Sequence, residues 1–127
     1  MVTVGVVAAC LLLSVAVFQL ALAAGAPFGR LAWGGRHEGV LPAGLRIASA
    51  IAGLVVYPVV IAIVLSASGV IDADLVPGQG DEVMWFLAAF FGVGAVANAV
   101  SRSPRERWWA PVSLAVAACC AYLASRL

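Results

Sequence analysis

Four long apolar runs alternate with short polar connections along the 127-residue chain. No charged residue falls inside these runs, which cover residues 2–24, 47–68, 83–100 and 108–125. A run of about 18 or more apolar residues is long enough to cross a bilayer as a helix. The pattern therefore predicts an all-α protein, with a single integral membrane domain over residues 1–127 that folds as an antiparallel four-helix transmembrane bundle.

The composition excludes an ordinary soluble domain. Hydrophobic residues make up 65% of the chain and charged residues 10%, whereas soluble domains are about 45–50% apolar and about 25% charged. The net charge is only +1, so nothing indicates a nucleic-acid partner. All seven basic residues are arginine, a bias typical of GC-rich bacterial genomes.

Arginine lies almost entirely on one side of the predicted bundle. The connection 70–82 holds four acidic residues and no basic one, and the two tails hold only Arg126. Cytoplasmic loops of membrane proteins are enriched in basic residues. We therefore expect the first and third connections in the cytoplasm and both termini outside (N-out/C-out), in a bacterial inner membrane. These two connections and their flanks contain Arg30, Arg36, Arg46, Arg102, Arg105 and Arg107.

The first connection, which includes "FGRLAWGGRHEGVLPAGLR" at residues 28–46, is unusually long. Helix hairpins are joined by roughly two to eight residues. Apolar side chains such as Leu31, Trp33 and Leu41 alternate with its polar groups. We expect an ordered cytoplasmic cap between the first two helices, and both a re-entrant and an interfacial position are compatible with the pattern.

A group of polar residues is expected at one depth, near the cytoplasmic mouth of the bundle. Amides inside membrane helices need hydrogen-bond partners and therefore face inward. One hypothesis is a ligand site in which arginines bind an anion and amides orient it; the other is hydrogen bonding between helices with arginines reaching the headgroups. The candidate ligand-binding residues are Gln19, Arg30, Trp33, Arg36, His37, Arg46, Asn98 and Arg102.

His37 and Glu38 form the only neighbouring pair that suggests acid–base catalysis. The pair does not continue as H-E-x-x-H, because Val40 and Leu41 follow, so the zinc-protease pattern is absent. The three cysteines lack metal-site spacing. His37 and Glu38 are therefore weak catalytic candidates, and no metal or cofactor is expected.

Three local features are expected in the second and fourth helices. Pro58 removes a backbone hydrogen bond and should kink the second helix next to Tyr57. Residues 103–106, "SPRE", fit a capping box with proline in the first turn of the fourth helix. Trp108 and Trp109 then follow at headgroup depth, where tryptophan is favoured.

The first connection, "GAPFGRLAWGG…LP…LR", and the turn "NAVSRSPRER" resemble those of an uncharacterised group of small bacterial four-span integral membrane proteins. The likeness covers most of the chain and is most specific in the first connection. It implies the same architecture, and it brings no activity or site residue with it.

These patterns favour a membrane protein that binds a small amphiphile, a lipid headgroup or an anion at its cytoplasmic mouth, with transport as one use. The alternatives are a small membrane-embedded enzyme acting on a lipid-like substrate and a structural subunit without a ligand. The expected partners are membrane lipids, anionic ones at the cytoplasmic face. Stripes of small residues fit either closure of the bundle or assembly into a homo-oligomer.

Overall fold

The computed structural model describes residues 1–76 and 80–127, so residues 77–79 of the connection 70–82 lie outside the described part. The described residues contain helices and no strand. Four helical stretches are long and apolar enough to cross a membrane, which confirms this part of the prediction. They are α1 (Val2–Ala23), the continuous rod of α2 (Ala43–Ile51), η3 (Ala52–Val56) and α3 (Tyr57–Ala67), α4 (Asp81–Ala99), and η4 (Glu106–Trp108) with α5 (Trp109–Arg126).

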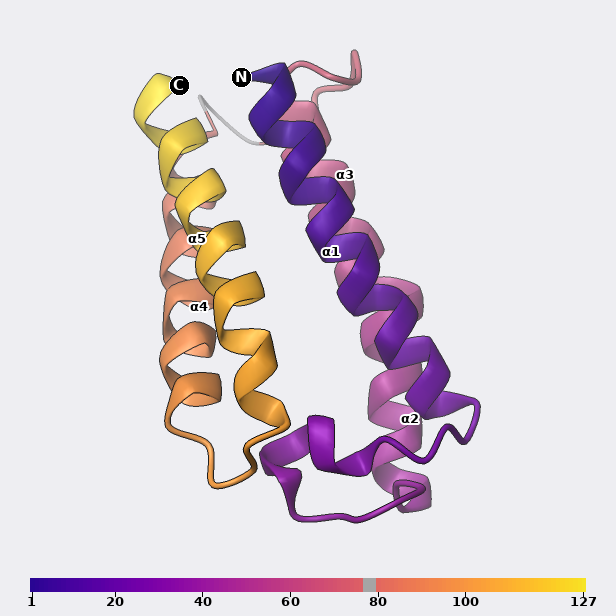
Figure 1. Cartoon of the computed structure of the whole chain (residues 1–127). Coiled ribbons are helices and arrows are strands. Elements are labelled where there is room, and N and C mark those ends of the chain that lie inside the picture. Colours follow the sequence, from indigo (N-terminus) through magenta and orange to yellow (C-terminus); the bar gives the residue numbers. More distant parts are fainter. Residues whose placement is uncertain (77–79) are drawn as a thin grey trace.

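The helices form two antiparallel pairs (Figure 1). The α2–α3 rod packs along α1, and α4 packs along α5. Both termini lie at one end of the bundle, and the connections 24–42 and 100–105 lie at the other, which we call the arginine-rich end. The two pairs are close together near the termini and diverge toward the arginine-rich end.

The main hydrophobic core joins the two pairs. Ala8 and Leu12 of α1 and Val64 of α3 are fully buried against side chains of α4 and α5. The partners from α4 and α5 include Met84, Leu87, Phe91, Val116, Cys120 and Leu123. This core therefore holds the two helix pairs together.

The second span changes its helical geometry at η3, a π-helical segment directly before Pro58. The backbone N–H of Tyr57 donates to the carbonyl oxygen of Ala52, five residues earlier. Pro58 has no backbone N–H, so one helical hydrogen bond is missing, and a wider turn of this kind accommodates that gap. Gly53 in this turn lies against α1: a Cβ there would be 2.7 Å from Leu20 Cγ.

The connection between α1 and α2 folds into two short 3-10 turns, η1 (Gly29–Leu31) and η2 (Trp33–Gly35), at the arginine-rich end (Figure 1). Leu22, Ala32 and Leu41 form a second small core that anchors the connection to α1. The Gly29 N–H donates to the Gly39 carbonyl oxygen at 2.8 Å and closes a loop over residues 29–39.

The fourth helix does not begin with the expected capping box. The N-cap position of η4 is Arg105, and no side chain caps it among the residues that the structure describes. The Ser103 hydroxyl donates instead to the backbone carbonyl oxygen of Arg30, at 2.6 Å. The prediction was wrong because η4 begins at Glu106, which places Arg105 and not Ser103 at the N-cap.

Candidate functional site

A cavity of about 820 Å³ lies between the two helix pairs. All four spans and residues 31–33 of the first connection line it. Since α1 packs against α3 and α5, and α4 packs against α5, the remaining side of this central cavity lies between α3 and α4. Val56, Phe86 and Val93 line the cavity there and are themselves exposed, so the cavity opens sideways to the bundle surface.

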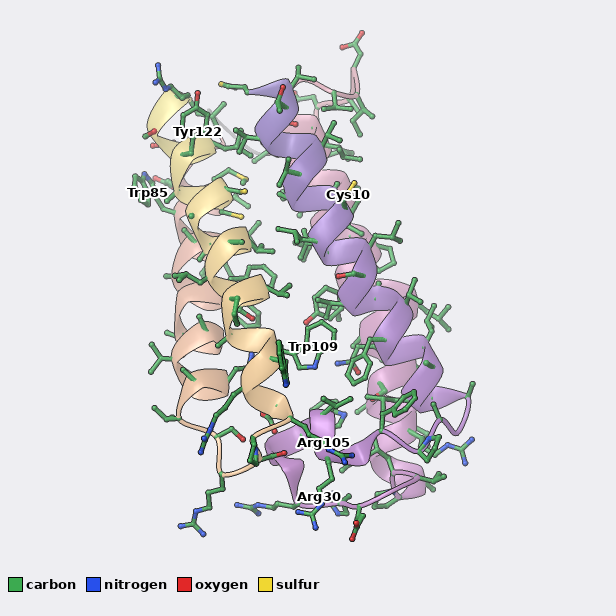
Figure 2. The ribbon with its side chains drawn as sticks, viewed as in Figure 1. Cys10, Arg30, Trp85, Arg105, Trp109 and Tyr122 are labelled. Carbon is green, nitrogen blue, oxygen red and sulfur yellow. The ribbon has the colours of Figure 1, made fainter. Side chains whose placement is uncertain are left out.

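Most of the wall of the central cavity is apolar. Val15 of α1, Val60 of α3 and Val112 of α5 line it, together with buried core residues such as Leu12 and Val116. Phe18 and Trp109 lie across from one another, with ring centroids 4.8 Å apart and planes inclined at 44°. Figure 2 shows Trp109 projecting from α5 toward α1. The space is therefore shaped mainly for apolar groups.

Polar side chains line the central cavity toward the arginine-rich end. The Asn98 amide donates to Ser113 Oγ at 3.4 Å, and Trp33 Nε1 donates to the fully buried Ser49 Oγ at 2.9 Å. Three further lining residues carry a buried polar atom that has no hydrogen-bond partner within residues 1–76 and 80–127. These atoms are Gln19 Oε1, Glu106 Oε2 and Trp109 Nε1. A buried polar atom without a partner costs about 1–3 kcal/mol, so the grouping of three requires an explanation.

Glu106 is the site residue that the sequence analysis missed. It is nine-tenths buried and is the only acidic side chain lining the described part of the central cavity. Three arginines lie close to Glu106 in the sequence, so the sequence pattern predicted a solvent-exposed residue that caps the helix. The helical spacing of Glu106 with Trp109, Ser113 and Val116, all of which line the cavity, was the signal that could have placed it inside.

A second cavity, of about 800 Å³, lies at the arginine-rich end and is lined by charged groups. Its four arginines are exposed, and Arg30 is 3.6 Å from the carboxylate of Glu38. Figure 2 shows Arg30 and Arg105 at this end of the molecule. We call it the arginine cavity; its lining consists of Arg30, Gly34, Gly35, Arg36, Glu38, Arg102, Ser103, Pro104 and Arg105.

The structure distributes the expected site residues over several places. Gln19, Trp33 and Asn98 line the central cavity, whereas the arginines at 30, 36 and 102 line the arginine cavity. The Arg46 guanidinium donates from Nε to the Ala23 carbonyl oxygen at 3.1 Å, at the end of α1. The sequence predicted one site at the mouth because these residues share a depth, whereas the structure distributes most of them between two neighbouring cavities.

His37 and Glu38 do not share a cavity in the described structure. Glu38 is 83% exposed and pairs with Arg30. His37 lines neither cavity within the described residues, and its buried Nδ1 lacks a hydrogen-bond partner there. The geometry thus offers no joint acid–base site for this pair. No group of three or more metal-binding side chains occurs in residues 1–76 and 80–127.

No protein-family model, curated protein or solved structure matches the chain. The likeness to small four-span membrane proteins that the sequence motifs indicate therefore stays a prediction. The functional argument depends on the two cavities.

Proposed function

We propose that the chain is a multi-pass protein of a bacterial cytoplasmic membrane that binds a small amphiphile in its central cavity. The observation that carries the proposal is a cavity of about 820 Å³ with apolar walls and polar side chains toward one end. Small-molecule sites have volumes of about 300–1,000 Å³ and a few polar groups on a mostly apolar wall. An amphiphile has the same division between an apolar body and one polar group.

The three unpartnered polar atoms favour a ligand site over loose packing of the helices as the explanation of the central cavity. Gln19 Oε1 accepts a hydrogen bond and Trp109 Nε1 donates one, and neither has a partner in the described residues. Both side chains line the central cavity, so a polar group of a bound molecule can supply the missing partners. The open side between α3 and α4 gives such a molecule a route from the bilayer without crossing water.

We propose that the arginine-rich end faces the cytoplasm and that the arginine cavity holds the phosphate of an anionic lipid. Arginine forms paired hydrogen bonds with phosphate oxygens, and clusters of basic residues beside a span attract anionic lipids. Four arginines around one cavity, opposed by a single carboxylate, support this assignment.

Transport is the use that the arrangement favours. Residues 30–35 contribute to both cavities, and Ser103, whose hydroxyl donates to the Arg30 carbonyl oxygen, lines the arginine cavity. Displacement of this segment would connect the central cavity with the aqueous side. A membrane enzyme is less favoured, because His37 lines neither cavity in the described structure.

The proposal is tested by filling the central cavity. Val60 lines it, while the neighbouring Val59 is half exposed on the outer surface of the same helix. Protein in phosphatidylglycerol nanodiscs is titrated with radiolabelled decyltrimethylammonium, decyl maltoside and decyl sulfate, and empty nanodiscs are subtracted. Wild type and Val59→Trp should bind at least one probe saturably, and Val60→Trp should lose that binding. Absence of saturable binding for all three probes, or equal binding by both variants, would contradict the proposal.

A further inference from the structure

We infer that the polar group of the bound amphiphile is positively charged and is recognised by Glu106. The inference rests on the proposed function and adds the class of ligand. Glu106 is nine-tenths buried, lines the central cavity and has an unpartnered carboxylate oxygen within the described structure.

The arginines near Glu106 in sequence are directed elsewhere. Arg102 and Arg105 line the arginine cavity, and Arg107 donates from Nε to the Ser101 carbonyl oxygen at 2.8 Å. In the described part of the chain no basic side chain lies within 4.0 Å of the Glu106 carboxylate. The buried carboxylate oxygen therefore has no partner among the described residues, and a buried ionisable group is stabilised when it is paired.

Aromatic side chains of the central cavity suit an organic cation. Trp109 follows Glu106 by one helical turn and packs against Phe18 with tilted rings, and Trp33, Tyr57 and Phe90 line the same cavity. The faces of aromatic rings attract cations, most strongly when the ion is removed from water. A quaternary or alkylated ammonium group on an apolar chain combines weak hydration with positive charge, so it complements both the rings and the carboxylate.

A role for Glu106 confined to the helix is the competing explanation. Glu106 is the first residue of η4, and a negative charge near the start of a helix is stabilising. An exposed side chain at this position would serve that role equally well. A role confined to the helix therefore leaves the burial of Glu106 beside the central cavity unexplained.

The test compares Glu106→Gln with Glu82→Gln, the same change at an exposed residue of α4 outside the central cavity. Phosphatidylglycerol nanodiscs are used because this lipid has no ammonium group that would compete. Each dissociation constant, for decyltrimethylammonium, decyl maltoside and decyl sulfate, is calculated from the probe concentration in the bilayer. That concentration is measured with empty nanodiscs. Wild type and Glu82→Gln should prefer the cation to the neutral probe by roughly tenfold, and Glu106→Gln should lose that preference.

The outcomes separate the inference from the proposed function. Saturable binding of the neutral or anionic probe with no preference for the cation would overturn the inference and leave the amphiphile site in place. Absence of binding by every probe would overturn both. A lower unfolding temperature of Glu106→Gln with unchanged probe preference would assign the residue to the helix alone. If Glu106→Gln does not fold, the preference of wild type among the three probes still shows whether the site selects a positively charged group.

Discussion

The hydroxyl of Ser103 donates a hydrogen bond of 2.6 Å to the backbone carbonyl oxygen of Arg30, and this bond joins two connections that are 73 residues apart in sequence. It links the first connection, beneath α1 and α2, to the turn between α4 and α5. The two helix pairs diverge toward this end (Figure 1). The bond therefore ties the pairs together where their helices are farthest apart.

Replacement of Ser103 by alanine should loosen this tie. A typical hydrogen bond contributes about 0.5–1.5 kcal/mol, and we expect a loss of about 1 kcal/mol in the free energy of unfolding. Hydrogen exchange of residues 30–36 should rise as well. Ser125→Ala removes a bond within α5, to the Tyr122 carbonyl oxygen, and should leave exchange in that segment unchanged. Equal exchange in both variants would show that the bond does not order the connection.

Gly35 provides a second test of the same contact. Its φ is +67°, and a Cβ there would lie 2.2 Å from Ser103 Cβ. Gly39 has a similar φ of +76°, but a Cβ there would meet no atom of the described residues within 4 Å. Gly39→Ala should cost about 1–2 kcal/mol from backbone strain alone. Gly35→Ala should cost more in thermal unfolding, since it also pushes the two connections apart, and equal losses would contradict the close approach.

The helical architecture was largely predictable from the chain. Apolar runs of membrane length and charged connections at fixed positions leave few alternatives, and the helices end within a few residues of the expected bounds. The second span is the main departure: it begins at Ala43, directly after Pro42, and includes Arg46, which donates to the Ala23 carbonyl oxygen at the end of α1.

The candidate site was predictable only in part. Depth alone grouped Gln19, Trp33 and Asn98 near the same end, and these three do line one cavity. Trp108 is 78% exposed, in keeping with an outward position, but Trp109 points inward to Phe18. The helical spacing of Glu106, Trp109 and Ser113 indicates that they share one side of the fourth span, but which side faces the cavity depends on packing against distant segments such as Phe18 of α1.

The π-helical turn allows a prediction about helix contact. A Cβ at Gly53 would lie 2.7 Å from Leu20 Cγ and 3.0 Å from the Ala16 carbonyl oxygen, whereas a Cβ at Gly92 in α4 would meet nothing within 4 Å in the part of the chain that the structure describes. Gly92→Ala should stabilise the protein by up to about 1 kcal/mol through helix propensity. Gly53→Ala should lower the unfolding temperature because α1 and η3 must separate. A gain in both variants would show that α1 is not held against this turn.

The orientation of the bundle is open to a direct experiment. Six arginines flank the connections at one end, and such residues concentrate in cytoplasmic loops. A reporter that is active only in the cytoplasm should be silent when fused after Leu127. The same reporter fused to a chain truncated after Pro104 should be active. The opposite pair of results would reverse the orientation and move the arginine cavity to the outer face.

Gln19 and Asn98 separate a ligand site from simple contact between helices. Gln19 Oε1 is buried without a hydrogen-bond partner in the described residues, so Gln19→Leu removes an unsatisfied group. It should leave the ligand-free protein as stable as wild type, or up to about 1–3 kcal/mol more stable. The Asn98 amide donates to Ser113 Oγ at 3.4 Å, so Asn98→Leu should cost about 0.6 kcal/mol, the average for such bonds inside membranes.

The response to a ligand then decides between the two roles. If both amides contact the bound amphiphile, the rise in unfolding temperature that a saturating decyl probe produces in wild type should be lost in both variants. Ser14→Ala, which removes a hydroxyl bonded to the Leu11 carbonyl oxygen on the exposed face of α1, should keep the full rise. An unchanged rise in Gln19→Leu and Asn98→Leu would show that these amides serve only the packing of the helices. A large loss of stability in ligand-free Gln19→Leu would show that Gln19 has a partner in the membrane, which would remove one support for the proposed site.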